Sequence, residues 1–213
     1  LQSVMAGRDV LAVAGTHGKT TTTAMLTIAM RAAGHDVSYA VGAEVPGLGT
    51  NARAGAGPWF VAEADESDGA FLVYEPLGAV VTNVDADHLD VWGTEEAYRA
   101  AFARFLDRIR PGGFVVGVVD DPGARDLLDL ARRRGLDVVG VGEAPDADLR
   151  MRHLRVSSSG TSYDVVVSGG GATGASGGGD EVLGSVTLQV PGRHYALDSL
   201  AALAAGLRTG TGF

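Results

Sequence analysis

The 213-residue sequence contains no cysteine and no apolar run that approaches the roughly 20 residues of a membrane-spanning helix. Disulfides and thiolate metal sites are therefore excluded. Basic runs are also missing, and 26 acidic against 17 basic side chains give a net charge of −9, which disfavours nucleic acid as a partner. Because the first ten residues fit no signal peptide, we expect a soluble cytoplasmic protein with neither a membrane nor a nucleic-acid partner.

Lysine is almost absent as well, since Lys19 is the only lysine among the 17 lysine and arginine residues. A position that stays lysine in so arginine-rich a sequence hints at a need for a compact, flexible ammonium group rather than a planar fork. Chance is the alternative explanation, and the surroundings of Lys19 must decide between the two.

Apolar runs alternate with helical periodicity over the first two-thirds of the chain. Strands are predicted at residues 10–14, 37–41, 59–63, 79–84, 114–119 and 138–141. This alternation is typical of βαβ units, so we predict an α/β fold with a mainly parallel sheet and helices on both of its faces.

After about residue 146 the pattern changes. Residues 149–156, 161–167 and 185–190 are predicted as short strands with no helix between them, which indicates a small, mostly antiparallel sub-sheet in the C-terminal third. The glycine-rich residues 168–184 are predicted to be a mobile hairpin loop. We expect a single domain over residues 1–213, composed of an α/β part (1–145), the sub-sheet with its loop (146–192) and a final helix (193–213).

Side chains at the predicted helix ends and faces support these assignments. The first helix has an expected buried face and ends at Gly34, while Thr94 and Asp121 are expected to cap two later helices. The expected buried face of the first helix consists of Met25, Ile28, Ala29, Ala32 and Ala33. That of the helix after Thr94 consists of Tyr98, Ala101, Phe102, Phe105 and Ile109.

The strongest chemical signal lies between the first strand and the first helix, in the run Gly15, Thr16, His17, Gly18, Lys19, Thr20 and Thr21. A turn of small residues at a helix N-terminus holds phosphate oxygens with its backbone N–H groups, and a lysine reaches the β/γ oxygens. Thr20 is placed to put its hydroxyl on a magnesium ion. Val13 stands where the strict phosphate-loop (P-loop) pattern has its first glycine, so the loop is a shortened variant. The alternative is a glycine turn with an incidental lysine.

Two acidic segments follow later strands of the predicted sheet. Glu63 closes one strand and begins the run EADESD, and Asn83 begins the run NVDADHLD, which contains His88. In open α/β sheets, ligands lie beyond the carboxyl ends of the strands, and Mg²⁺ prefers hard oxygen ligands there. We therefore expect Glu63 to face the loop. The alternatives are a solvated acidic loop and, for His88, a structural histidine.

Five segments together resemble the central ATP-binding domain of the Mur ligase family. They are AGTHGKTTTTAM (14–25), NARAGAG (51–57), VAEADESDGAFL (61–72), VVTNVDADHLD (80–90) and GRHYALDSLAALAAG (192–206). They span almost the whole chain in the family's order. The combination of EADESD with TNVDADH after AGTHGKT is more specific than a phosphate loop alone.

The resemblance implies an activity. ATP would phosphorylate the carboxylate of UDP-N-acetylmuramate, and L-alanine would attack the acyl phosphate to form an amide in peptidoglycan precursor synthesis. It also implies roles for individual residues. Lys19, Glu63 and His88 would be catalytic; residues 15–21, Asn83, His194 and Asp198 would bind ATP; Thr20, Glu63 and His88 would hold two Mg²⁺ ions; and Asn51, Arg53 and Asp65 would lie toward the muramyl substrate.

The sequence departs from the family pattern at several points. Tyr195 and Asp198 stand where many members have asparagine, and no lysine besides Lys19 is available for the carbamylated metal ligand of several relatives. Members of the family also have an N-terminal UDP-binding domain and a C-terminal ligase domain. We therefore expect this chain alone to bind ATP–Mg²⁺ weakly and not to complete the ligation.

Three other functions remain open from the sequence. One is a related ligase that recycles muropeptides and has a similar phosphate loop. A second is an ATPase switch that dimerises with nucleotide, which explains neither EADESD nor TNVDADH. The third is a module that binds nucleotide without chemistry, which Asp198 in place of asparagine favours.

Overall fold

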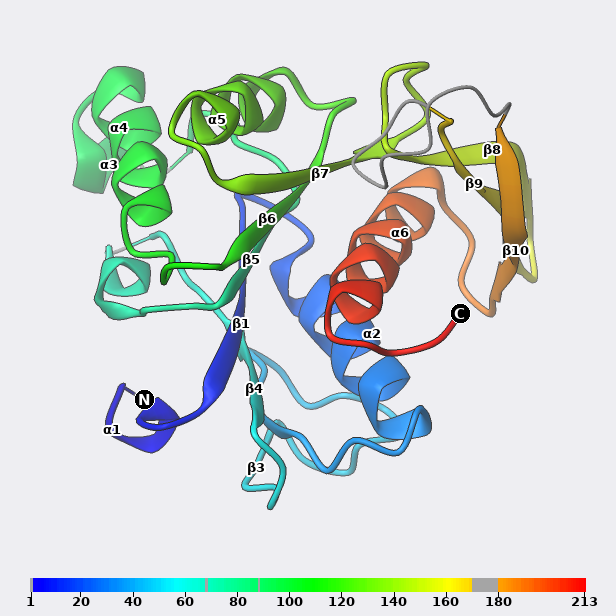
Figure 1. Ribbon diagram of the computed structural model, residues 1–213, viewed down its shortest axis with the longest axis horizontal. Coiled ribbons are helices and arrows are strands. Elements are labelled where there is room, and N and C mark those ends of the chain that lie inside the picture. The colour runs from blue at the N-terminus through cyan, green and yellow to red at the C-terminus, as the bar shows by residue number, and fades with distance from the viewer. Residues whose placement is uncertain (1, 68, 88, 170–179) are drawn as a thin grey trace.

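The computed structural model describes residues 2–67, 69–87, 89–169 and 180–213 (Figure 1). The strands are β1 (Asp9–Ala14), β2 (Ser38–Ala40), β3 (Ala52–Arg53), β4 (Trp59–Glu63), β5 (Gly78–Val81), β6 (Phe114–Val118), β7 (Asp137–Gly142), β8 (Leu149–Ser157), β9 (Gly160–Val167) and β10 (Glu181–Leu188). The helices are α1 (Gln2–Met5), α2 (Lys19–Ala32), the 3₁₀ helix η1 (Ala70–Val73), α3 (Leu89–Trp92), α4 (Glu95–Leu106), α5 (Pro122–Arg133) and α6 (Arg193–Arg208).

The strands form one sheet in the order β10-β9-β8-β7-β6-β5-β1-β4-β2-β3. Pairing is parallel from β2 through β8 and antiparallel at both ends, between β2 and β3 and along β8, β9 and β10. The predicted α/β class with a mainly parallel sheet is therefore confirmed, and so are antiparallel strands in the C-terminal third. They do not form a sheet of their own, however, because the start of β8 pairs with the end of β7 and continues the main sheet.

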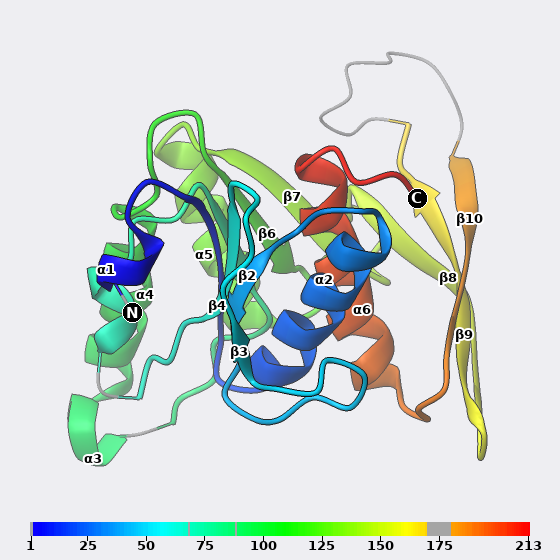
Figure 2. The same ribbon diagram turned by 90° about the horizontal axis from the view of Figure 1, so that it is seen from below.

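Helices cover both faces of the parallel part (Figures 1 and 2). On one face, α2 and α6 pack against each other and against a core that includes Leu26, Met30 and Leu200. On the other face, α4, α5 and η1 enclose a core that includes Phe71 and Phe102. Within the described part of the chain, no helix is both long and apolar enough to cross a membrane.

The predicted buried face of α2 is wrong. Ile28 remains 43% exposed and Ala32 and Ala33 are exposed, whereas threonines such as Thr23 and Thr27 are buried. The hydroxyl of Thr23 donates to the carbonyl of Lys19 at 2.7 Å, and that of Thr27 to the carbonyl of Thr23 at 2.8 Å. A hydroxyl that is hydrogen-bonded inside its own helix can be buried at little cost. A prediction that places only apolar residues on the buried face is therefore wrong for this helix.

The predicted helix starts are confirmed. The Thr94 hydroxyl accepts a hydrogen bond from the N–H of Ala97 at 3.2 Å and so caps α4. The Asp121 carboxylate accepts from the N–H of Ala124 at 2.7 Å and caps α5. The expected face of α4 is buried as well, including Tyr98.

Parallel pairing fixes where the chemical segments meet. Val13 of β1 is opposite Glu63 of β4, and Ala14 is opposite Val81 of β5. Since parallel strands have their carboxyl ends at the same edge, the segments that follow β1, β4 and β5 are brought together there. These segments contain the glycine turn, the run EADESD and the run NVDADHLD.

Replacing Asp121 with alanine tests how firmly this edge is held. One oxygen of Asp121 accepts both from Ala124 and from the N–H of Val84, at 3.0 Å, in the segment after β5. We expect Asp121→Ala to lower the free energy of unfolding by about 1–3 kcal/mol, measured by urea denaturation at pH 7.

The matched control is Asp126→Ala in the same helix. The Asp126 side chain is 78% exposed and lies 3.6 Å from Arg99, so its loss should change stability by less than about 0.5 kcal/mol. Equal losses in the two variants would contradict a specific role for the Asp121 carboxylate.

Candidate functional site

The turn between β1 and α2 depends on two glycines. Gly15 has a φ of 140°, and a Cβ atom there would overlap the Thr82 hydroxyl. Gly18 has a φ of 82°, and its Cβ would lie 2.5 Å from a carboxylate oxygen of Asp198. A side chain at either position would therefore clash and strain the backbone, so the tight turn that the sequence predicts requires glycine at both.

Residues after β5 are hydrogen-bonded to both the backbone N–H and the backbone carbonyl of His17. The N–H of His17 donates to the side-chain oxygen of Asn83 at 2.8 Å, and the Asn83 amide donates back to the His17 carbonyl at 3.0 Å. The Thr82 hydroxyl donates to the same carbonyl at 2.6 Å. Asn83 thus stabilises the turn. This structural role comes in addition to the contact with nucleotide that the sequence predicts.

The ammonium group of Lys19 lies beneath this turn. Its Nζ donates to the carbonyl of Gly15 at 2.8 Å and to that of Thr16 at 3.3 Å. It also forms an ion pair with Glu66, at 2.9 Å from Oε2. Lys19 is the first residue of α2, so a short rotation of its flexible side chain serves any anion bound at this helix N-terminus.

Glu66 and Tyr98 form the floor of the site. Glu66 is fully buried, and burial raises the pKa of its carboxyl while the hydrogen bond from Lys19 acts in the opposite direction. The Tyr98 hydroxyl lies 2.8 Å from that of Thr16 and 3.5 Å from Glu66 Oε1. Burial likewise raises the pKa of Tyr98 well above its ordinary value, so this hydroxyl stays neutral.

Thr20 and Glu63 provide the oxygen pair expected of a magnesium site. The Thr20 hydroxyl donates to Glu63 Oε1 at 2.8 Å, and Glu63 Oε2 accepts from the N–H of Gly42 at 2.6 Å. Hard oxygens of a hydroxyl and a carboxylate suit Mg²⁺, which also keeps water or phosphate as ligands. Within the described ranges no three histidine, aspartate or glutamate side chains converge on one point. Thr20 and Glu63 fit an ion that takes its other ligands from phosphate and water.

The other residues expected to bind nucleotide lie on different elements. Asp198 of α6 is only 7% exposed and lies against Gly18, and burial raises the pKa of its carboxyl to about 7, with the nearby Thr22 hydroxyl partly offsetting this. His194 is exposed at the start of α6 with its ring 4.1 Å from that of Tyr195. Thr21 is half-buried in the first turn of α2. His88 lies outside the described residues.

The expected substrate residues are exposed and lie away from the turn along the chain. Arg53 of β3 pairs with Asp36 at 2.7 Å, and the carbonyl of neighbouring Asn51 accepts from the N–H of Val41. The Asp65 carboxylate accepts from the N–H of Ser67 at 3.0 Å. Their roles remain predictions.

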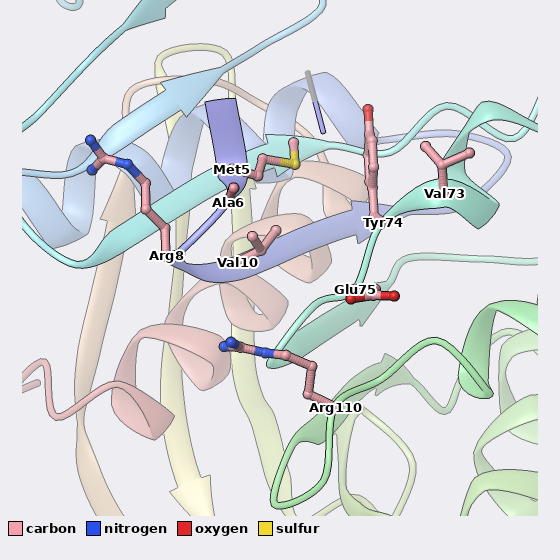
Figure 3. A pocket seen from close by; sticks show the side chains of 9 residues that line it. Met5, Ala6, Arg8, Val10, Val73, Tyr74, Glu75 and Arg110 are labelled. Atoms are coloured by element: carbon pink, nitrogen blue, oxygen red, sulfur yellow. The ribbon is translucent and has the colours of Figure 1, made fainter. Parts of the chain in front are cut away.

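A hollow of about 200 Å³ lies at the amino ends of the strands, opposite the glycine turn (Figure 3). Met5, Val10 and Tyr74 line its apolar part. Its two arginines already have protein partners, because Arg110 pairs with Asp9 at 2.5 Å and Arg8 donates to the carbonyl of Gly57 at 2.8 Å. Neither arginine of this hollow is thus free of a protein partner.

Sequence reasoning missed three residues of the site: Thr82, Glu66 and Tyr98. Thr82 lies in the recognised run TNVDADH, yet nothing in that run indicates that its hydroxyl contacts the glycine turn. Glu66 was part of the recognised acidic run, yet nothing in the run distinguishes the buried Glu66 from the exposed Asp65. Tyr98 was assigned to the apolar face of its helix. Its hydroxyl group could have indicated that this face also contacts a polar site.

Comparison with known proteins identifies the family of the chain. The family model described as the Mur ligase middle domain matches residues 13–206. The chain belongs to the Mur ligase family. Two curated relatives, both called UDP-N-acetylmuramate–L-alanine ligase, come from Nocardioides sp. (51% identical, 99% of this chain and 40% of the relative) and Acidothermus cellulolyticus (46% identical, 100% and 42%). The chain thus spans about two-fifths of the length of these relatives.

Solved structures of Mur ligases share the fold. The UDP-N-acetylmuramate:L-alanyl-γ-D-glutamyl-meso-diaminopimelate ligase from Neisseria meningitides superposes with a TM-score of 0.80 at 27% identity, covering 97% of this chain and 63% of that one. The UDP-N-acetylmuramate–alanine ligase from Thermotoga maritima gives 0.74 at 26% identity, covering 95% and 42%. A MurF ligase from the same organism, solved in complex with ADP, gives 0.73 at 20% identity, covering 98% and 48%, which shows the fold alone.

Replacing Asp198 with asparagine tests the burial of its carboxyl. The folded chain keeps a proton up to about pH 7, whereas the unfolded chain releases it near pH 4. Between these values the wild type should lose about 1.4 kcal/mol of stability per pH unit relative to Asp198→Asn, and the difference should level off above pH 7.

Urea denaturation of both proteins between pH 4 and 9 measures this difference. Asp126→Asn, at an exposed position of α5, is the matched control and should follow the wild type throughout. A pH-independent difference between wild type and Asp198→Asn would show that the carboxyl is charged in the folded chain.

Proposed function

We propose that this chain is the ATP-binding part of an ATP-dependent ligase that joins L-alanine to UDP-N-acetylmuramate. The observation that carries the proposal is the meeting of Lys19 and the Thr20–Glu63 oxygen pair at one sheet edge, beside a glycine turn that opens a helix. The names of the relatives supply the substrates, and membership of the Mur ligase family removes the reason to consider an ATPase switch.

The reaction needs charge neutralisation and alignment more than it needs covalent chemistry from the protein. The γ-phosphoryl group passes to the muramyl carboxylate, ADP leaves, and the amine of L-alanine displaces phosphate from the acyl phosphate to form the amide. Backbone N–H groups at the N-terminus of α2 and the ammonium group of Lys19 would hold the β- and γ-phosphate oxygens. These contacts stabilise the charge that moves onto the bridging oxygen as the bond breaks.

We propose that Thr20 and Glu63 hold a first Mg²⁺ ion and that Glu63 and His88 hold a second. When bound, Mg²⁺ supplies positive charge to the phosphate oxygens. The hydrogen bond between Thr20 and Glu63 already keeps both oxygens at the mouth of the turn, and the N–H of Gly42 fixes the other Glu63 oxygen. Little side-chain rearrangement is then needed for the ion to bind.

The base of ATP would lie near Asn83, His194 and Asp198. An ionised aspartate only accepts hydrogen bonds, whereas a neutral carboxyl group also donates one. A pKa of about 7 makes the neutral form of Asp198 available near neutral pH, so it can act as the asparagine of many relatives does. Asn51, Arg53 and Asp65 would lie toward the muramyl group.

The remaining substrate contacts fall to parts that the relatives have and this chain does not cover. We propose that residues 1–213 are a single central domain, made of residues 1–145, 146–192 and 193–213 as expected from the sequence. Alone, this domain would bind Mg²⁺–ATP and would not release phosphate in response to L-alanine. Robust L-alanine-dependent phosphate release by this chain would refute that restriction.

A muropeptide-recycling ligase is the second candidate. The TM-score of 0.80 with the Neisseria enzyme favours this candidate. The sequence identity of 51% with an L-alanine ligase outweighs it, because the identity with the Neisseria enzyme is only 27%. Because the acceptor contacts fall to those other parts, two hybrid proteins separate the candidates. This chain is linked in one to the flanking parts of the Nocardioides relative and in the other to those of the Neisseria enzyme, and each hybrid is assayed for phosphate release with its own acceptor, L-alanine or the tripeptide. The set of flanking parts with which this chain supports phosphate release identifies the candidate to which it belongs.

Replacing Lys19 with methionine tests the proposal on this chain. Calorimetry with a non-hydrolysable ATP analogue and Mg²⁺ should show binding to the wild type that weakens at least about tenfold in Lys19→Met, because the charge-assisted contacts to phosphate are lost.

The matched control is Arg31→Met, which removes a cation from the exposed last turn of the same helix and should change the dissociation constant less than about twofold. Equal weakening in both variants would indicate attraction by overall charge and would contradict a phosphate site at Lys19.

A further inference from the structure

The ion pair between Lys19 and Glu66 occupies the group that the proposed function needs. All three N–H bonds of the ammonium group have acceptors within 3.3 Å, namely the carbonyls of Gly15 and Thr16 and the carboxylate of Glu66. An ammonium group has three donors and no more. Contact with phosphate therefore requires that Lys19 give up one of its present partners.

Glu66 is far less able to move than Lys19. Its side chain is fully buried, and its carbonyl accepts from the indole N–H of Trp92 at 3.1 Å. The Tyr98 hydroxyl approaches Glu66 Oε1 from α4. The Lys19 side chain is 13% exposed and has a flexible four-carbon stem that begins at the N-terminus of α2, where phosphate would bind.

We propose that Glu66 is the resting partner of Lys19: it holds the ammonium group in the nucleotide-free turn, and the β- and γ-phosphates of ATP displace it. The inference rests on the proposed function, because it presumes a triphosphate at residues 15–20. Glu66 is thus a positioning residue that acts through Lys19. It takes the ammonium group back when nucleotide leaves.

Displacement has a consequence for affinity. Separating a buried ion pair costs free energy, so part of the attraction between Lys19 and the phosphates is spent on breaking the contact with Glu66. An amide in place of the carboxylate keeps the shape and removes the charge. Nucleotides that have β- and γ-phosphates should therefore bind more tightly to Glu66→Gln, whereas AMP should not.

Calorimetry of this chain with Mg²⁺ and either AMP or the β,γ-imido analogue of ATP tests the exchange. We expect Glu66→Gln to bind the analogue about tenfold more tightly than the wild type and AMP with unchanged affinity. In a Lys19→Met background the same substitution should have no effect, because the partner to be released is gone. Asp126→Asn, at an exposed position of α5, controls for the loss of one negative charge and should change neither affinity.

Other outcomes overturn the inference. Weaker binding of both nucleotides by Glu66→Gln would make Glu66 a structural support, and tighter binding with or without Lys19 would reveal a general charge effect. Unchanged affinity in Glu66→Gln, with Lys19-dependent binding in the wild type, would refute the exchange and leave the proposed function standing. Binding by none of the proteins would refute both.

The single lysine allows a second measurement that needs no variant. Labelling the chain with ¹⁵N-lysine gives one ammonium signal by NMR, and it belongs to Lys19. That signal should shift when the β,γ-imido analogue and Mg²⁺ are added and should stay in place with AMP. No shift at saturating analogue would contradict the exchange even if Glu66→Gln failed to fold.

Discussion

Close contact between the glycine turn and the segment after β5 determines the shape of the candidate site. Gly15 lies so near Thr82 that no side chain fits between them, and the Asn83 side chain is hydrogen-bonded to both the backbone N–H and the backbone carbonyl of His17. These contacts exist because β1 and β5 are parallel neighbours whose carboxyl ends coincide. The strand order thus delivers a turn whose backbone is already fixed before any ligand arrives.

The acidic side chains around this turn differ in how their charge is balanced. Glu63 faces a hydroxyl and a backbone N–H, which suits an oxygen pair that can take a cation. Glu66 is deeper and pairs with the ammonium group, while Asp198 is buried beside Gly18 and keeps a raised pKa. Three carboxyl groups around one turn therefore have different surroundings: one faces a hydroxyl and a backbone N–H, one an ammonium group, and one is buried with a raised pKa.

The architecture and the backbone of the candidate site could be predicted from the sequence. The roles of individual side chains could not be predicted where they depend on burial. Strand–helix alternation, the caps at Thr94 and Asp121 and the glycine turn depend on local patterns, so they could be predicted. The buried face of α2 could not, because threonine hydroxyls are satisfied inside the helix. The sequence likewise does not distinguish Glu66 from Asp65. Only the path of the chain after β4 determines that Glu66 is buried and Asp65 is exposed.

The retention of one lysine in an arginine-rich chain follows from the same geometry. Two carbonyls and a carboxylate surround a single nitrogen atom at 2.8–3.3 Å beneath the turn. A compact ammonium group directs its donors to all three, whereas a planar guanidinium spreads its donors over several nitrogens and needs more room than a nearly closed site offers. Arginine can replace lysine at exposed ion pairs of this protein, such as that between Arg53 and Asp36, where solvent leaves space for the fork. Lysine at position 19 is thus explained by the site rather than by chance.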